Sequence, residues 1–377
     1  RLRVGGVLYI SYNTQPGWAQ MVPMRQLMIE YMETMSAPGE GIVGRIDSAI
    51  KYVDDLLEAS PGYVSLNPAA ASRVKTLKGQ NRNYLAHEYF NRDWQPMLFA
   101  EFSRWLEPAK VSFACSAQYS DHFDVFNLLP AQVQILGKIS DVTFRQSARD
   151  FMVNRQFRKD YWIKGPHRLT PDEQKAALRD QAVVLITDPG EIVLKADGSL
   201  VERDLPALIY RPIIELLADR QVRSLGQIED QLSDSGIPFG PLVEAIMVLI
   251  GKGNVAAVQD GTTTRRAMDG AAKLNRHLIE SSVRSARVRH LASPVTGGGV
   301  FVQDFHLQML LAREQGLELP EQWAEFIRQG LVAKGAGLSK PGGGLMSVEE
   351  SLAALTTEAK SFAAKQLPRL QTLKVVA

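Results

Sequence analysis

Polar and aromatic side chains suited to ligand binding follow a short apolar run near the start of the chain. The run Val7–Ile10 is rich in strand-forming residues, and a Pro-Gly turn comes soon after it. Tyr12, Asn13 and Trp18 lie at or just beyond its carboxyl end, where open α/β sheets bind their ligands. A phenol and an amide can orient a polar ligand group, and an indole can form an apolar wall. The pattern therefore predicts a binding site at the end of this strand.

A second group of candidate residues, His87, Glu88 and Tyr89, lies in a neighbouring segment of the chain. An imidazole beside a carboxylate can accept a proton from a bound ligand. The structural alternative is a tight turn after the first strand, with Asn13 capping the bend and Trp18 packed in the core. Both interpretations are open from the sequence.

Composition and charge exclude several classes of protein. The 377 residues carry 43 Lys plus Arg against 41 Asp plus Glu, so no global field attracts nucleic acid, and no nucleic-acid partner is expected. The six histidines lie far apart, and no set with metal-ligand spacing is found, so no metal site is expected. The one cysteine, Cys115, lies in an apolar strand-like run and is predicted to be a buried thiol.

The length and hydropathy of the chain bound its organisation and location. Its 377 residues predict two or three domains. No apolar stretch approaches the roughly 20 residues that span a bilayer, and no signal peptide is visible, so a cytoplasmic location without membrane insertion is expected. Because the chain begins with Arg1 rather than Met and with a strand that looks central, we expect preceding strands to be missing.

The apolar patterns predict an α/β fold with a helical insertion. Val7–Ile10 is typical of a strand buried on both faces inside a parallel sheet, and residues 111–117 form a further strand of that sheet. Residues 1–18 and 81–120 would form this sheet region, with residues 84–90 extended and 97–106 helical. Residues 19–80 form a helical insertion in which methionines recur on one helix face, which suits a core or a dimer interface.

The remainder of the chain is predicted to form further α+β domains. Residues 121–262 form a middle region, in which the basic residues near 155–164 are predicted to be solvated side chains at the start of a strand. Three helices and a strand between 213 and 258 indicate a winged-helix-like unit suited to protein contact rather than DNA. Residues 263–377 form a C-terminal α+β domain. Local signals include a helix start at Thr170, a hairpin turn at Asp197-Gly198 and a capping box at Ser347.

Several stretches together resemble one family of proteins. They are RLRVGGVLYISYNTQPGW, YLAHEYFNRDWQPMLFAEFSRWLEPAKVSFACSA, NRQFRKDYWIKG and LASPVTG. The chain resembles class I, AdoMet-dependent methyltransferases that carry a methyltransferase regulatory domain, a group that includes bacterial protein-lysine methyltransferases of outer-membrane proteins. The resemblance covers about residues 1–312 and implies that Val7–Ile10 is part of the fifth strand of a Rossmann-like methyltransferase sheet.

The resemblance implies a function and a donor. S-adenosylmethionine would be the methyl donor, and a protein lysine the acceptor. Tyr12, Asn13 and His87 would orient the amine and accept its proton, and Trp18, Glu88 and Tyr89 would bind the substrate. The family's glycine-rich turn after its first strand has no counterpart here, so the cofactor-binding residues are unknown and expected mostly outside this chain.

Other functions remain open from the sequence. The chain could be a catalytically inactive, partner-binding remnant of a methyltransferase, or an enzyme that methylates a small molecule. A glycine-rich strand-turn-helix upstream in the reading frame would favour catalysis, and its absence would favour the inactive module. A homodimer through residues 19–80 is a further expectation.

Overall fold

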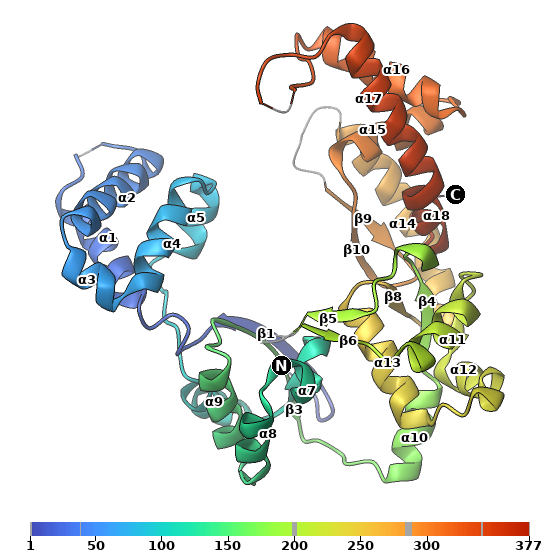
Figure 1. The fold of residues 1–377 in the computed structure, drawn as a ribbon, viewed down its shortest axis with the longest axis horizontal. Helices are drawn as coiled ribbons and strands as arrows, with labels where there is room; N and C mark the ends of the chain where they lie inside the picture. The colour runs from blue at the N-terminus through green and yellow to red at the C-terminus, as the bar shows by residue number, and fades with distance from the viewer. Residues whose placement is uncertain (1, 38, 198–201, 283–288, 341, 377) are drawn as a thin grey trace. The chain divides into compact units, whose positions relative to one another are not determined.

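The computed structural model describes residues 2–37, 39–197, 202–282, 289–340 and 342–376. The chain divides into two compact units (Figure 1). One comprises Arg1–Arg168 with Asp197–Arg203, and the other comprises Leu169–Ala196 with Asp204–Ala377. Within the described ranges, no helix is both long and apolar enough to cross a membrane.

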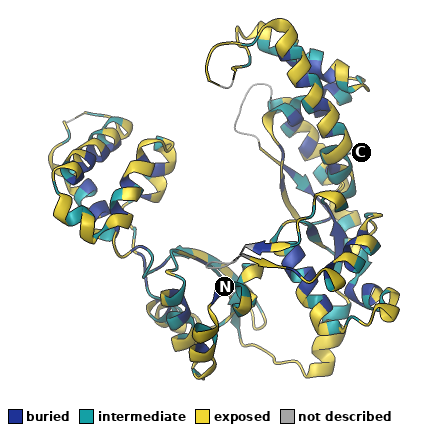
Figure 2. Cartoon of the chain, viewed as in Figure 1, coloured by how far each residue is buried: buried dark blue, intermediate teal, exposed yellow. Residues whose placement is uncertain are grey.

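Five helices form a bundle in the first unit, and the buried residues of the bundle lie in its interior (Figures 1 and 2). They are α1 (Val22–Thr34), α2 (Ile42–Glu58), α3 (Pro61–Leu66), α4 (Pro68–Lys78) and α5 (Arg82–Glu88). Met24, Met28 and Met32 of α1 are buried in the core of this bundle, together with Ile46 and Val53 of α2. Residues 19–80 are therefore mostly helical, and most of their methionine stripe is core in this chain, while their assignment as an inserted domain stays a prediction.

The prediction that residues 84–90 are extended is wrong, because α5 covers most of them. The Asn81 side chain begins this helix by accepting hydrogen bonds from the Asn83 N–H at 2.9 Å and the Tyr84 N–H at 3.2 Å. Leu85 and Tyr89, four residues apart, are then buried together in the bundle core. The bundle thus extends beyond residue 80, and the finer domain boundaries predicted from the sequence stay predictions.

A three-stranded sheet forms the rest of the first unit, with helices on one of its faces. Its elements are β1 (Val7–Asn13), α6 (Phe99–Leu106), η1 (Glu107–Ala109), β2 (Val111–Ser116), η2 (Tyr119–His122), α7 (Asp124–Asn127), α8 (Pro130–Gly137), α9 (Val142–Met152) and β3 (Phe157–Lys164). The strand order is β1-β3-β2, and β3 runs antiparallel to both neighbours. β1 and β2 therefore belong to one sheet, as predicted, and run parallel to each other.

The two faces of β1 differ from the sequence prediction. Val7 and Tyr9 are 54% and 51% exposed, so in this chain the strand is not buried on both faces. Its alternate residues Leu8, Ile10 and Tyr12 pack against the cluster formed by α6, β2 and β3. β1 also pairs antiparallel with β3 rather than with a parallel neighbour in the described residues.

The second unit begins with helices around a small antiparallel sheet, in which β4 is central between β7 and β8. Its elements are α10 (Pro171–Arg179), β4 (Ala182–Leu185), η3 (Pro189–Glu191), α11 (Ala207–Leu217), β7 (Arg223–Ser224), α12 (Leu225–Gln231), η4 (Ser233–Ser235), α13 (Phe239–Gly251) and β8 (Val255–Val258). The helix start at Thr170 is confirmed, because its hydroxyl accepts a hydrogen bond from the Glu173 N–H. The three predicted helices and the strand between 213 and 258 are present, and their winged-helix assignment stays a prediction.

A separate two-stranded sheet is formed by β5 (Lys195–Asp197) and β6 (Glu202–Asp204), which pair with each other. The predicted Asp197-Gly198 turn between them includes Gly198, which lies outside the described residues.

The last part of the chain is mostly helical. It contains α14 (Gly261–Ser282), β9 (His290–Ser293), β10 (Gly298–Phe301), α15 (Asp304–Glu314), α16 (Pro320–Ala333), α17 (Val348–Ser361), the π-helix η5 (Phe362–Gln366) and α18 (Leu367–Thr372). The predicted turn between two strands is present, but only Gly297 lies in it, because Gly298 and Gly299 belong to β10 and pair with Ser293 and Ala292 of β9. The Ser347 capping box is also confirmed. Leu310, Trp323 and Phe362 are at the centre of an apolar core that these helices share.

Candidate functional site

The carboxyl ends of β1 and β2 and the start of β3 lie at one edge of the first sheet. Asn13, the last residue of β1, pairs with Phe157, the first residue of β3. β2 ends at Ser116, and the Ala117 N–H donates to the Lys159 carbonyl at 2.8 Å. Because parallel strands place their carboxyl ends at the same edge, this is where an α/β sheet binds ligands.

A cavity of about 310 Å³ opens at this edge. Its lining includes Gln118, Asn154, Arg155, Phe157 and Lys159. Asn154 has a φ of +46°, a left-handed conformation that non-glycine residues rarely adopt. The Phe157 ring is 40% exposed at the start of β3. The edge therefore offers amide, cationic and aromatic groups to a ligand.

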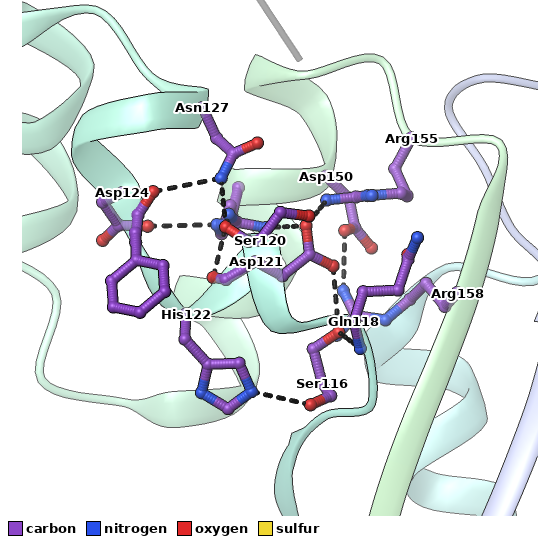
Figure 3. Close-up of polar contacts among 12 residues, drawn as sticks. Ser116, Gln118, Ser120, Asp121, His122, Asp124, Asn127, Asp150, Arg155 and Arg158 are labelled. Atoms are coloured by element: carbon purple, nitrogen blue, oxygen red, sulfur yellow. Dashed lines mark hydrogen bonds and ion pairs between the residues drawn. The ribbon is translucent and has the colours of Figure 1, made fainter. Parts of the chain in front are cut away.

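Asp121 organises the turn that follows β2 (Figure 3). Its carboxylate accepts hydrogen bonds from the Ser116 hydroxyl at 2.9 Å and from Arg155 Nη2 at 2.7 Å. The Ser116 hydroxyl in turn accepts from the Gln118 N–H at 3.1 Å. Burial acts to raise the pKa of Asp121, but Arg155 and Arg149 outweigh it and lower the pKa overall. The turn that carries Gln118 is thus fixed to the segment that begins β3.

A second charged group is buried between the sheet and α9. Arg158 is 5% exposed, and it donates to Asp160 through Nε at 2.8 Å and to Asp150 through Nη1 at 2.6 Å. Asp150 and Asp160 are each 1% exposed. Burial raises the pKa of Asp150 to about 6, against the opposing effect of Arg158. The Tyr12 hydroxyl donates to Asp160 at 2.8 Å, which joins β1 to this group.

The candidate residues of the first strand and turn fall in different environments. Tyr12 is on the covered face of β1, where its ring stacks on Phe102 at 3.9 Å between centroids. Asn13 is half-buried at the edge described above. Trp18 is 7% exposed and packs in the helical bundle against Tyr89 and Trp94. The structure therefore brings Tyr12 and Asn13 to the sheet edge and Trp18 into the bundle core.

The candidate residues of the second group lie at the end of α5. His87 and Glu88 are exposed, and Tyr89 is 5% exposed beside Trp18. Gly17 connects the bundle to the edge, since its N–H donates to the Arg155 carbonyl at 2.9 Å. A Cβ at Gly17 would lie 2.5 Å from that carbonyl oxygen, so only glycine fits this close approach. Trp18 and Tyr89 are thus brought together, and the roles of all six candidates stay proposals.

Sequence analysis missed the groups that β3 contributes. Arg158 was predicted to be solvated, and it is buried. Phe157, Gln118 and Asn154 were not among the candidate site residues. The sequence FRKDYWIK could have predicted the burial of Arg158. Arg158 and Asp160 lie at alternate positions with Trp162, so in a strand they share the face of this large apolar residue. Cys115 is half-buried, and burial raises the pKa of its thiol, which agrees with an unreactive side chain. Among the described residues, no group of His, Cys, Asp or Glu could hold a metal ion.

Comparisons with known proteins give a domain match and a fold match. Residues 81–164 match the model of a predicted methyltransferase regulatory domain, and they include α6–α9, β2 and β3. The structure of PKMT2 from Rickettsia typhi in complex with AdoHcy matches the whole chain with a TM-score of 0.62 and 15% identity, over 76% of that protein's chain. A second structure of PKMT2 gives a TM-score of 0.57. The chain therefore shares the mixed α/β fold of PKMT2, and residues 81–164 match the regulatory-domain model.

The sequence relatives place the chain in a family. It is 35% identical over 375 residues to uncharacterized protein sll1526 of Synechocystis, which covers 100% of this chain and 72% of that protein. It is 27% identical over 162 residues to uncharacterized protein RP789 of Rickettsia prowazekii, over 42% of this chain and 28% of that one. The chain therefore belongs to the same family as uncharacterized protein sll1526.

Proposed function

We propose that the protein is an AdoMet-dependent methyltransferase that methylates lysine side chains of proteins. The observation that carries the proposal is the edge of the first sheet, where the carboxyl ends of two parallel strands meet a polar cavity lined by Gln118 and Phe157. The fold match to PKMT2, whose structure holds AdoHcy, supports the choice of donor. AdoHcy is the product that remains when AdoMet has given up its methyl group.

At the edge of the first sheet, the described residues do not form a cradle for AdoMet. A nucleotide donor needs open backbone at a glycine-rich turn and a free carboxylate for its ribose. At this edge, Gly17 is already packed against Arg155, and the Asp121 carboxylate is occupied by Arg155, Arg149 and Ser116. The proposal therefore assigns the donor mainly to residues outside this chain and the acceptor to the edge described here.

The acceptor must lose its charge before it can react. A lysine side chain has an ordinary pKa of about 10.4, and only its neutral amine is a nucleophile. An apolar wall disfavours the ammonium form and lowers that pKa. Phe157 supplies such a wall at the cavity, and the side-chain amide of Gln118, which also lines it, can orient the amine; Asn13 pairs with Phe157 beside this cavity.

The test is methyl transfer from radiolabelled AdoMet by the protein expressed from its complete reading frame. Denatured protein extracts and a small-molecule fraction from the source cells serve as acceptors, and mass spectrometry then locates the methyl group. Label on lysine in protein is the expected result. Label only in the small-molecule fraction would assign the enzyme a different substrate, and AdoMet binding without any transfer would favour a partner-binding module.

A further inference from the structure

Tyr12 is held from two sides at the end of β1. Its ring stacks on Phe102 of α6, and its hydroxyl donates to Asp160 of β3 at 2.8 Å. Burial raises the pKa of Tyr12 above its ordinary value, so the phenol stays neutral and donates this bond throughout the working pH range. One residue further along β1, Asn13 reaches the candidate edge. The position of that edge thus depends on how Tyr12 is held.

Asp160 is in turn fixed by Arg158. Two nitrogens of the guanidinium reach the two carboxylate oxygens, Nε to Oδ2 at 2.8 Å and Nη2 to Oδ1 at 3.2 Å. This two-point contact fixes both the distance and the plane of the carboxylate. The remaining contacts of Arg158 go to α9, from Nη1 to Asp150 at 2.6 Å and from Nη2 to Gln146 at 2.9 Å. Its guanidinium also lies 4.4 Å from the centre of the Phe99 ring.

A contribution to folding stability alone does not explain this buried group of charges. Burying two carboxylates and a guanidinium carries a large desolvation cost, and well-packed apolar residues of similar volume are often equally or more stabilising. One oxygen of Asp150, Oδ2, is buried without a hydrogen-bond partner in the described structure. What the buried charges do provide is a defined direction for each hydrogen bond, which an apolar cluster lacks.

We propose that Asp160 is a positioning residue for Tyr12, and that Arg158 connects it to Asp150 and Gln146 of α9. The proposal rests on the function proposed above. Asp160 is 1% exposed beneath the sheet, so it contacts no substrate and acts only through Tyr12. Since α9 and β3 lie within the segment that matches the regulatory-domain model, this hydrogen-bonded chain links that segment to the end of β1.

A double-mutant cycle on methyl transfer tests the proposal. The variants are Tyr12→Phe, which keeps the ring and removes the hydroxyl, Asp160→Asn, and the two combined. Tyr9→Phe is the matched control, because Tyr9 lies on the same strand but is 51% exposed on the opposite face. If Asp160→Asn does not fold, Gln146→Ala replaces it as a milder change at the α9 end of the chain of hydrogen bonds.

We expect each single variant to lower kcat about tenfold with little change in KM, and the combined variant to lower it no further. Tyr9→Phe should retain full activity. Multiplying effects, near a hundredfold in the combined variant, would overturn the proposal, as would a loss of stability in Asp160→Asn with unchanged kcat.

A wild-type protein that methylates nothing would contradict the proposed function instead. Positioning is then judged by hydrogen exchange of the amides at the end of β1. Faster exchange in both Tyr12→Phe and Asp160→Asn, with Tyr9→Phe unchanged, would support positioning, and unchanged exchange in all three would overturn it.

Discussion

Around Arg158 the core of the sheet is charged, whereas around Phe362 the core formed by α15–α17 is apolar. Arg158 has carboxylates and an amide as its neighbours, and Phe362 has Trp323 and other apolar groups. His306 is the polar neighbour of Phe362, and its ring bonds to a half-exposed glutamate rather than to another buried charge. Apolar packing stabilises the fold through contact area and tolerates changes of side-chain shape. The stability of the charged group depends on the presence of every partner and on the direction of each hydrogen bond.

The largest effect is expected where one member of the charged group is removed. Arg158→Met leaves Asp150 and Asp160 buried without their cation, which should cost about 3–5 kcal/mol of the free energy of unfolding. Arg145→Met is the control, because Arg145 is half-exposed and pairs with Asp124 at 3.3 Å, so it should cost less than about 1 kcal/mol. Denaturant-dependent hydrogen exchange of β3 amides measures both losses of stability. Equal losses would show that the buried charged group depends on its cation no more than an exposed ion pair does.

The apolar core should respond to volume rather than to direction. Leu310 is 2% exposed, and Leu310→Ala should cost about 2–5 kcal/mol through the cavity it leaves. Leu310→Met keeps the volume and should cost less than about 1.5 kcal/mol. Arg158→Lys, which likewise keeps charge and length, should cost more than Leu310→Met because lysine cannot make the two-point contact with Asp160. Urea unfolding of the four proteins tests this order, and a cheap Arg158→Lys would contradict it.

The charged core should also respond to pH. The pKa of Asp150 is raised to about 6, so between its ordinary value and about pH 6 the folded state binds more protons than the unfolded state. Stability from this group is therefore greatest below that window and falls as pH rises through it. Relative to Asp150→Asn, the wild-type protein should gain about 1–3 kcal/mol as the pH is lowered from 7 to 4. A pH-independent difference between the two unfolding curves would show that Asp150 does not titrate in this range.

The smallest effects are expected at helix starts, where the two regions should behave alike. The Asp141 side chain accepts from the Phe144 N–H at 2.7 Å to begin α9, and Ser347 accepts from the Glu350 N–H at 3.1 Å to begin α17. Asp141→Ala and Ser347→Ala should each cost about 1 kcal/mol, because each leaves a helix N–H without its cap. Thermal unfolding measures both. A much larger loss for Asp141→Ala would mean that the position of α9 is more critical than its cap alone.

Features set by neighbouring residues could be predicted from the sequence. The Thr170 and Ser347 helix starts and the turn between β9 and β10 depend on contacts within a few residues. All three are confirmed, although only Gly297 of the three glycines lies in that turn. The apolar runs of β1 and β2 and their spacing predicted that both strands belong to one sheet, and the strand order confirms it.

Features that depend on distant partners could not be predicted. Arg158 meets Gln146 only when α9 folds back on β3, and Tyr12 meets Asp160 across 148 residues of chain. Composition alone makes Arg158 look like a surface cation, which is why its burial was missed. The exposed Val7 and Tyr9 show the same limit, because an apolar run alone does not reveal whether one face or both faces of its strand are covered in the fold.

The most direct test of the proposed function is AdoMet binding by calorimetry. It is made on this chain and on the chain extended upstream as far as its reading frame continues. In the proposed function the edge formed by Asn13 and Phe157 binds the acceptor, and the described residues at this edge form no cradle for the donor, so binding by the extended protein alone is predicted. Binding by neither protein would contradict the methyltransferase proposal.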